Sequence, residues 1–194
     1  MSRVDTQILG QQSRSLEFSK QAAIVISASL FVALCARVTV PLMPLSPVPL
    51  TLQNFGVLTV GLLLGSRRGF AALALYLGEG ALGLPVFSPA VLGSGITHLL
   101  GPTGGFLMAY PIVAFVAGYL YEHSSRRFGW AALSAVAAEL VLFAGGLSWL
   151  AVLTHSVSLA IRFGLYWFVF AEVIKVLMAA AVATRWHQRH SPSR

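Results

Sequence analysis

Two charged residues, Glu172 and Lys175, lie in the middle of an apolar run, "GLYWFVFAEVIKVLMAAAVA" at residues 164–183. A run of this length and composition is typical of a helix that crosses a membrane. Ionisable side chains inside a bilayer are costly and are usually retained for function. Residues three apart share one face of a helix, so the pair is either a self-neutralising structural ion pair or part of a polar ligand site. We favour the ligand site, because each group keeps free hydrogen-bonding positions.

Further polar and aromatic side chains within or beside apolar runs extend this candidate site. They are Gln53, Asn54, Tyr76, Glu79, Glu139 and Phe168. Phe168 falls on the helical face of the charged pair, and Tyr76 and Glu79 repeat the three-residue spacing. Gln53 and Asn54 either cap a helix or point their amides into a cavity. Glu79 is either an interfacial acid or a site residue, and Glu139 either pairs with another helix or lines the cavity.

The composition places these residues in a membrane protein. The 194 residues are 57% hydrophobic and only 10% charged, and the mean hydropathy is +0.79. Soluble domains carry about 25% charged residues, so we expect an integral membrane protein without a separate soluble domain. The net charge of +7 is spread in small clusters between apolar runs, unlike the basic stripe of a nucleic-acid-binding protein. A single cysteine, Cys35, excludes an internal disulfide.

Six apolar runs predict an all-α bundle of about six transmembrane helices. They lie at about residues 21–40, 52–65, 69–84, 105–121, 129–149 and 163–184. We expect a single membrane domain with a cytoplasmic tail before it and a basic cytoplasmic tail after it. The boundaries of these three parts are 1–20, 21–185 and 186–194.

Basic residues predict the orientation of the bundle. With six spans, ten lysine and arginine side chains fall on one side, whereas only Arg37 and Arg162 lie near the other face. Loops rich in Lys and Arg stay in the cytoplasm, so both termini are expected there. The simplest interpretation of Arg37 and Arg162 is that they snorkel to the outer interface.

Two loops on the outward side are unusual. Residues 41–53, "PLMPLSPVPLTLQ", contain prolines that exclude regular helix. Residues 83–107, "GLPVFSPAVLGSGITHLLGPTGGFL", are apolar but broken by Gly and Pro. Backbone of this kind near membrane depth must be buried in protein or line a cavity, because lipid cannot satisfy its polar groups. We therefore favour a covered, mostly apolar pocket for a small amphipathic ligand over ordinary external loops.

The sequence lacks the motifs of common catalytic sites. It has no G-x-x-x-x-G-K-[ST] loop for ATP, no H-E-x-x-H or G-x-S-x-G motif, and no Cys/His cluster with metal-ligand spacing. No catalytic residue, metal or cofactor is predicted. An intramembrane enzyme that uses Glu139, Glu172 and Lys175 for acid–base chemistry is the weaker alternative, because it would also need a nucleophile or a metal.

Four motifs resemble a known family. P-V-P-x-T-L-Q, L-L-G-x-R-R-G, G-L-P-V-F and L-G-P-T-G-G with a following proline occur over about residues 45–121. Together they resemble the biotin-specific S component of energy-coupling factor (ECF) transporters, the BioY family. The resemblance implies a six-helix subunit of the bacterial plasma membrane with a Gly/Pro-broken outward loop between its third and fourth helices. It implies capture of biotin, the transported substrate, and partners that supply the energy: a transmembrane coupling subunit and two ATPases.

The resemblance also implies roles for the candidate residues. Biotin carries a cyclic urea with two N–H donors and one carbonyl. Glu172 would accept the N–H groups, and Lys175 would neutralise Glu172 and donate to the carbonyl. Amide contacts and packing against the bicyclic ring would come from Gln53, Asn54, Phe168 and Tyr76.

Two features of this implied site leave alternatives open. The candidates for binding the carboxylate of biotin are Arg37, His98 and Arg162. The family's Gly-Asp dipeptide ahead of the lysine reads Ala171–Glu172 here, and the added methylene moves the carboxylate by roughly one C–C bond length. The alternative ligand is therefore another small vitamin, bound by a related S component.

Small residues on the first helix are implied to contact the coupling subunit. Ser29 and Ala33, four residues apart, form the best pair for this partner interface. Gly61 and Gly65 form another pair of the same kind, which we expect to pack within the chain.

Overall fold

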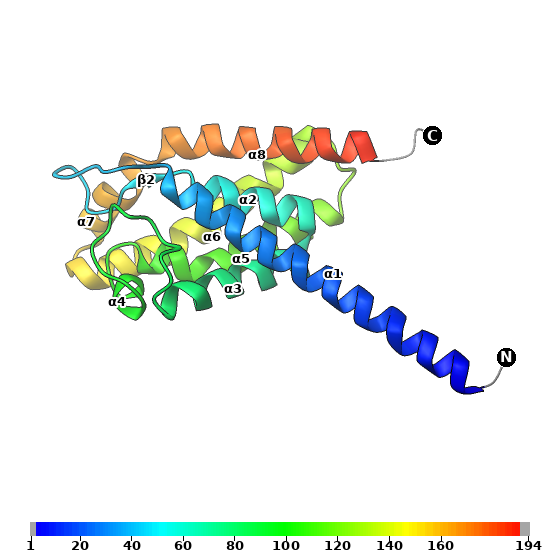
Figure 1. Ribbon diagram of the computed structural model, residues 1–194. Coiled ribbons are helices and arrows are strands. Elements are labelled where there is room, and N and C mark those ends of the chain that lie inside the picture. The colour runs from blue at the N-terminus through cyan, green and yellow to red at the C-terminus, as the bar shows by residue number, and fades with distance from the viewer. Residues whose placement is uncertain (1–2, 191–194) are drawn as a thin grey trace.

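The computed structural model describes residues 3–190, with side chains from residue 16 onward. Its long helices form one bundle (Figure 1): α1 (Arg3–Arg37), α2 (Gln53–Leu64), α3 (Ser66–Ala81), α5 (Gly104–Glu122), α6 (Phe128–Thr154) and α8 (Val169–His190). Short elements lie between them: β1 (Thr39–Val40), β2 (Leu50–Thr51), α4 (Ile96–Leu99), α7 (Val157–Ile161) and the π-helix η1 (Arg162–Tyr166). The predicted all-α architecture is confirmed, with one antiparallel two-residue ladder between β1 and β2 added to it.

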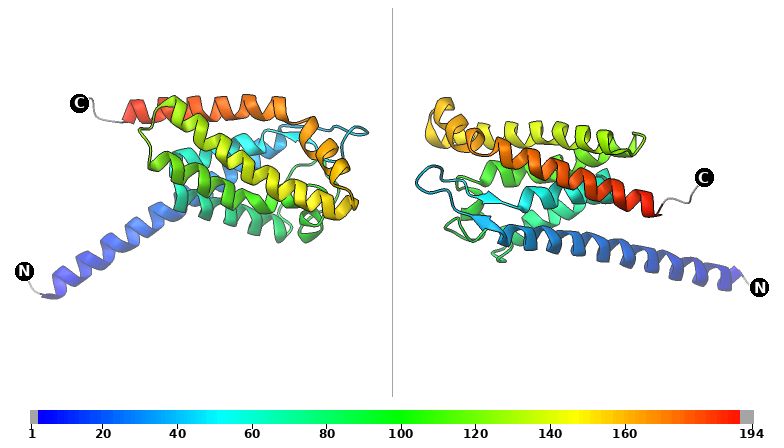
Figure 2. Two further views of the ribbon diagram at one scale, coloured as in Figure 1. Left: turned by 180° about the vertical axis from the view of Figure 1, so that it is seen from behind. Right: turned by 90° about the horizontal axis from the view of Figure 1, so that it is seen from above.

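The two ends of the bundle differ. The start of α1 and the end of α8 lie at one end, whereas the β1–β2 loop, α4 and α7 gather at the other (Figures 1 and 2). Termini on one side agree with the orientation expected from the basic residues. That this side is the cytoplasm stays a prediction.

The helices differ in their ability to cross a membrane. Within residues 3–190, the segments long and apolar enough are Leu16–Arg37, Gly104–Glu122 and Phe128–Thr154, and a bent pair forms a fourth. The remaining α2 and α3 have 12 and 16 residues, or about 18 and 24 Å at 1.5 Å per residue. The hydrocarbon core is about 30 Å thick. Six helices occupy the six predicted runs, but the count of six full spans stays a prediction.

The predicted sixth span, 163–184, is wrong as a single helix. Val157–Tyr166 meets Val169–His190 at an angle of 47°. No proline lies in this stretch to mark the bend. The apolar run therefore reads as continuous in the sequence. In the structure, Ser46 Oγ donates to the carbonyl oxygen of Phe163 at 2.7 Å, which ties the β1–β2 loop to the bend.

The two predicted tails are largely helical. α1 is continuous from Arg3, so the described part of 1–20 extends the first span, and α8 continues to His190, inside 186–194. Residues 1–2 and 191–194 lie outside the described residues.

Close helix packing centres on α5, which contacts α2, α3 and α6. At Gly61, a Cβ would lie 2.6 Å from the carbonyl oxygen of Ala114 on α5. Only glycine permits this approach of α2 to α5, as at small-residue contacts in other membrane proteins. The expectation that Gly61 packs within the chain is confirmed, and the contact fixes α2, which carries Gln53 and Asn54 at its start.

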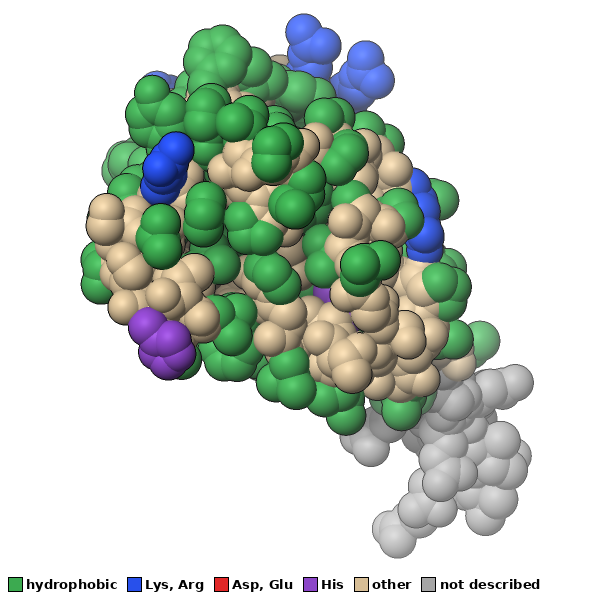
Figure 3. Space-filling model, turned by 90° about the vertical axis from the view of Figure 1, so that its left-hand side faces the viewer, with side chains coloured by type: hydrophobic (Ala, Val, Ile, Leu, Met, Phe, Trp, Pro, Cys, Tyr) green, Lys and Arg blue, Asp and Glu red, His purple; other side chains and the backbone are tan. Residues whose placement is uncertain are grey.

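The loop end has few charges on its surface. Figure 3 looks onto this end and shows mostly apolar and uncharged polar side chains, a few basic ones and no acidic one. Large apolar side chains on the sides of the bundle, including Leu34, Leu140 and Phe170, are exposed. An apolar belt of this kind fits a multi-pass membrane protein, whose sides face lipid.

Candidate functional site

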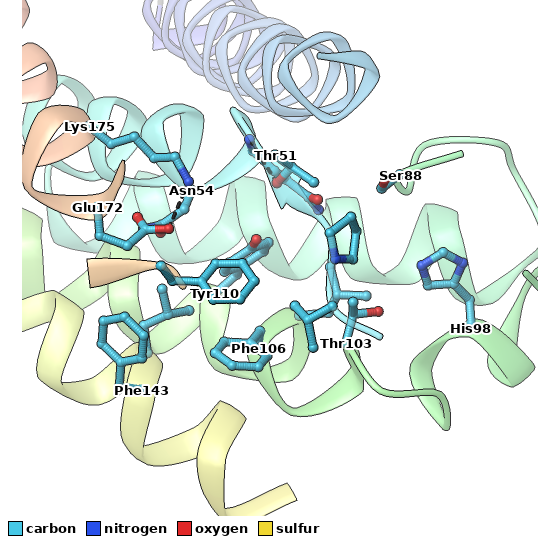
Figure 4. A pocket seen from close by; sticks show the side chains of 16 residues that line it. Thr51, Asn54, Ser88, His98, Thr103, Phe106, Tyr110, Phe143, Glu172 and Lys175 are labelled. Atoms are coloured by element: carbon cyan, nitrogen blue, oxygen red, sulfur yellow. Dashed lines mark hydrogen bonds and ion pairs between the residues drawn. The ribbon is translucent and has the colours of Figure 1, made fainter. Parts of the chain in front are cut away.

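A cavity lies under the loops, between α2, α5, α6 and the start of α8 (Figure 4). Its walls are Val48, Pro49, Thr51, Gln53, Asn54, Ser88, His98, Thr103, Phe106, Leu107, Tyr110, Leu142, Phe143, Phe168, Glu172 and Lys175. The cavity is small: its volume is about 50 Å³, which is room for a few water molecules. Both outward loops contribute to the walls, so the cavity-lining role expected for 83–107 is confirmed by Ser88, His98 and Thr103.

One end of the cavity holds a buried polar cluster, which we call the charged end: Asn54, Glu139, Glu172 and Lys175. Lys175 Nζ donates to Glu172 Oε1 at 2.7 Å. Asn54 Nδ2 donates to Glu172 Oε2 at 2.7 Å and to Glu139 Oε1 at 2.5 Å. Each of the four residues is at most 7% exposed. Such desolvated ion pairs need further hydrogen bonds to be tolerated, and Asn54 supplies them.

Local structure explains why Glu172 and Lys175 face the cavity. α8 begins after the bend, and the Glu172 amide donates to the carbonyl oxygen of Phe168 at 2.9 Å. Glu172 therefore lies in the first turn of α8, one turn after Phe168 and one turn before Lys175. Phe168 lines the same wall of the cavity. An acid in a first turn is favoured by the helix dipole. The sequence prediction that these three residues share one face is confirmed.

Gln53 is held by a residue behind the cavity wall. Its Nε2 donates to Tyr76 Oη at 2.6 Å, and Tyr76 donates to the carbonyl oxygen of Val86 at 2.9 Å. Leu52, not Gln53 or Asn54, is the N-cap of α2, and no side chain caps the helix. Of the two interpretations from the sequence, the structure therefore shows the second, in which Gln53 and Asn54 line the cavity. Tyr76 is fully buried and is absent from the cavity wall, so it orients Gln53.

The opposite end of the cavity has hydroxyl groups and an imidazole, and we call it the hydroxyl end: Ser88, His98 and Thr103. Figure 4 shows Ser88 and His98 on the side away from Glu172, with Tyr110 and Phe106 between the two ends and Phe143 on the side of Glu172; we call these three aromatic residues the floor. Thr103 Oγ1 is buried and has no hydrogen-bond partner among the described residues. Burial lowers the pKa of the His98 imidazole below its ordinary value of 6.5, so His98 is neutral at neutral pH.

The start of α5 adds backbone donors beside Thr103. The Gly104 amide donates to Gly101 and the Leu107 amide to Thr103. Among the described residues, the backbone N–H groups of Gly105 and Phe106 donate to no backbone carbonyl oxygen outside the helix. Free N–H groups and the dipole make the N-terminus of a helix attractive to anions.

Three sequence candidates lie away from the cavity. Arg37 and Arg162 are exposed and absent from its walls, as their snorkelling interpretation implies. Glu79 accepts a hydrogen bond of 2.5 Å from Ser29 Oγ, which joins α3 to α1. Ser29 is fully buried, so its hydroxyl is used within this chain. A partner contact through Ser29 and Ala33 stays a prediction.

Sequence reasoning named His98 but missed Ser88, Thr103 and the aromatic floor. Thr51 and Thr103 lie within the motifs P-V-P-x-T-L-Q and L-G-P-T-G-G, and that membership was the available signal. Phe106, Tyr110 and Phe143 look like ordinary apolar residues of membrane helices, so nothing in the sequence distinguishes them. Among the described residues, no group of three or more His, Cys, Asp or Glu side chains could hold a metal ion.

Comparisons with known proteins agree with this architecture. The model of the BioY family matches residues 8–191. The biotin transporter BioY of Thermotoga maritima is 39% identical over 161 residues, which cover 83% of this chain and 94% of the relative. The probable biotin transporter BioY of Pyrococcus horikoshii is 36% identical over 167 residues, 86% of this chain and 96% of the relative.

One solved structure has the same fold. It is the crystal structure of the S component for biotin from an ECF-type ABC transporter, with a TM-score of 0.79 over 89% of this chain and 93% of that chain. The two sequences are 21% identical, so this likeness concerns the fold.

Proposed function

The chain belongs to the BioY family, and we propose that it captures biotin from the outer side of the membrane for uptake. It is a multi-pass membrane protein and a transport protein, not an enzyme. The observation that carries the proposal is the buried Glu172–Lys175 pair at one end of a cavity whose walls are largely apolar. Its chemistry matches a cyclic urea, which offers donors and an acceptor side by side.

The charged end is the proposed place of the urea ring. Glu172 accepts one hydrogen bond at each carboxylate oxygen, and each oxygen has a second lone pair for a urea N–H group. Lys175 donates one of its three N–H bonds to Glu172, which leaves donors for the urea carbonyl. Gln53 Oε1 is a further acceptor, because only Nε2 is engaged by Tyr76. Phe168 and the aromatic floor then pack against the fused rings.

The hydroxyl end is the proposed place of the valerate carboxylate. Its donor is Thr103 Oγ1, beside the first turn of α5 and the neutral His98 ring. Hydrogen-bond donors and a helix N-terminus can hold a carboxylate without an arginine. This replaces the sequence expectation of a cation from Arg37 or Arg162, since neither lines the cavity. Of that set only His98 lines the cavity, and its Nδ1 lies 3.5 Å from the carbonyl oxygen of Gly93, so the neutral ring has no second N–H group for the carboxylate.

Transport needs partners in this proposal. The chain contains no ATP-binding loop, so energy comes from a transmembrane coupling subunit and ATPases, as the ECF context of the structural relative implies. The termini face the cytoplasm of a bacterial cell, in accord with the basic residues at that end. The loop end then opens to the outside.

The alternatives have less support. Another small vitamin remains the alternative ligand, because Glu172 carries one methylene more than the family's aspartate. Acid–base catalysis by Glu139, Glu172 and Lys175 has neither a metal cluster among the described residues nor an adjacent nucleophile to act with.

The test is equilibrium binding of biotin to the purified chain in detergent, measured by calorimetry. We expect one-to-one binding, a loss of at least about 100-fold in affinity for Lys175→Ala and Glu172→Gln, and no change for Arg162→Ala. Riboflavin and thiamine test the alternative ligand in the same experiment. Failure of the folded parent to bind biotin would refute the proposal, and equal binding by all variants would return the charged pair to a structural role.

A further inference from the structure

The charged end carries an unbalanced set of ionisable groups. Glu139 and Glu172 are 6% and 7% exposed, and Lys175 is 7% exposed. If all three were ionised, one negative charge would stay uncompensated in a site surrounded by apolar helices. An isolated buried charge is very costly, and such groups usually become neutral instead. Lys175 is bonded to Glu172, so Glu139 is the acid without a counter-ion.

Two buried oxygen atoms mark the same place. Among the described residues, Asn54 Oδ1 and Glu139 Oε2 have no hydrogen-bond partner. They belong to two side chains already joined by the bond from Asn54 Nδ2 to Glu139 Oε1. Turning the Asn54 amide over does not help, because its oxygen would then face the oxygens of both acids. Both atoms are acceptors when Glu139 is ionised, so neither can satisfy the other.

We propose that Glu139 is a proton-binding residue, whose carboxyl group carries a proton on Oε2 and donates it to Asn54 Oδ1. A protonated carboxyl group has one O–H donor, so a single proton satisfies both unpartnered oxygens and removes the excess charge. An acid and a primary amide then form a ring of two hydrogen bonds. The inference deepens the biotin site and rests on the proposed function for its effect on binding.

Glu139 acts in this scheme as a positioning residue. The ring with Glu139 fixes the orientation of Asn54, whose second N–H bond is directed at Glu172 Oε2. Asn54 in turn holds the carboxylate that accepts the urea. Glu139 itself is absent from the cavity wall and lines an apolar groove between α6 and α8 instead.

Loss of the proton would weaken binding. The titratable groups that face Glu139 are Glu172 and Lys175 from α8 and Tyr110 from α5, and α2 contributes the uncharged Asn54. An ionised Glu139 would repel Glu172 and compete for Lys175. Biotin affinity is therefore expected to fall in mildly alkaline buffer in the parent and to stay constant in Glu139→Gln, whose amide can form the same two bonds without a proton.

Infrared spectroscopy tests the proton without biotin. The chain has only six acidic residues, so the carbonyl stretch of one protonated carboxyl group is resolvable. We expect this band at neutral pH in the parent and in the control Glu79→Gln, which alters an acid bonded to Ser29, and its absence in Glu139→Gln. A band that is missing from the parent, or one that persists in Glu139→Gln, would overturn the proposal.

Calorimetry tests the consequence for the site. Glu139→Gln is expected to bind biotin within about threefold of the parent, and Glu139→Leu, which leaves Asn54 only its bond to Glu172, to lose about tenfold or more. Equal losses in both variants would show an ionised Glu139 and refute the inference. If the parent binds no biotin, the proposed function fails, and the infrared band still decides whether Glu139 carries a proton.

Discussion

The two ends of the cavity are built in different ways. At the charged end, Glu172 and Lys175 bind each other and Asn54, so the protein itself supports the groups that a ligand would meet. At the hydroxyl end, Thr103 Oγ1 has no partner among the described residues and lies beside the first turn of α5. The first end is held in place before a ligand arrives, whereas the second has a donor that only a ligand or water can use. A change at the charged end should therefore affect stability and binding together, and loss of the Thr103 hydroxyl should affect binding alone.

The largest effect is expected from Lys175→Met. Removing one partner of a buried ion pair leaves the other charge uncompensated, at a cost of about 3–5 kcal/mol. The variant should unfold more readily in a denaturing-detergent titration and should lose biotin binding.

The double variant Glu172→Gln/Lys175→Met is the control for this prediction. It removes both charges, so stability should recover in large part while biotin binding stays lost. If the double variant were as unstable as Lys175→Met, the uncompensated charge on Glu172 would not be the cause of the lost stability.

The second prediction concerns Thr103→Val at the hydroxyl end. The hydroxyl group has no protein partner to lose, so the unfolding midpoint should stay within error of the parent. Biotin affinity should fall about tenfold, the value of one hydrogen bond to a charged group. A biotin analogue with an uncharged amide in place of the carboxylate should lose less affinity in the variant, because a hydrogen bond to a neutral acceptor contributes less than one to a charged group.

Thr59→Val is a matched control for Thr103→Val. Thr59 Oγ1 is also buried without a partner among the described residues, but Thr59 lies outside the cavity. Its substitution should leave biotin affinity unchanged. If both variants lost affinity equally, the loss in Thr103→Val could not be assigned to the hydroxyl end of the cavity.

Tyr76→Phe should have a smaller effect. The substitution keeps the ring that packs on Phe87 at a centroid distance of 5.4 Å and removes the hydrogen bonds to Gln53 and to the carbonyl oxygen of Val86. One neutral hydrogen bond contributes about 1 kcal/mol, so affinity should fall by several-fold through a mobile Gln53. Calorimetry measures this loss, and an unchanged affinity would mean that Gln53 keeps its orientation without the hydrogen bond to Tyr76.

The smallest effect is a pH dependence from His98. Burial lowers its pKa below 6.5, so the unfolded chain binds the proton more readily than the folded one. The stability that the neutral ring contributes is present above about pH 6.5 and is lost as the pH falls toward the folded pKa. His98→Gln should flatten this part of a stability–pH profile, and an unchanged slope would assign it to another group.

The sequence predicted the helices and the charged end better than the rest of the cavity. Apolar runs mark helices directly, and Glu172 and Lys175 stand out because charges are rare in such runs. Tyr76 was also noticed, but its place behind Gln53 depends on how α2 and α3 pack, which spacing along one chain does not determine.

The carboxylate partner could not be chosen from the sequence for a related physical reason. The candidates were Arg37, His98 and Arg162, and of these only His98 lies in the cavity wall, as does Thr103. Backbone donors have no signature in residue types. The bend before α8 was missed because its partner, Ser46, lies 117 residues earlier in the chain.

The bond from Ser46 to the carbonyl oxygen of Phe163 has a kinetic consequence. It fastens the β1–β2 loop, with Val48 and Pro49 in the cavity wall, to the bend ahead of α8. The cavity of about 50 Å³ is too small for a bicyclic ligand, so part of its wall must move before biotin binds, and we expect the β1–β2 loop to be that part. Association should then reach a ceiling at high ligand concentration, set by the rate of detachment, and Ser46→Ala should raise that ceiling and shorten the residence time together.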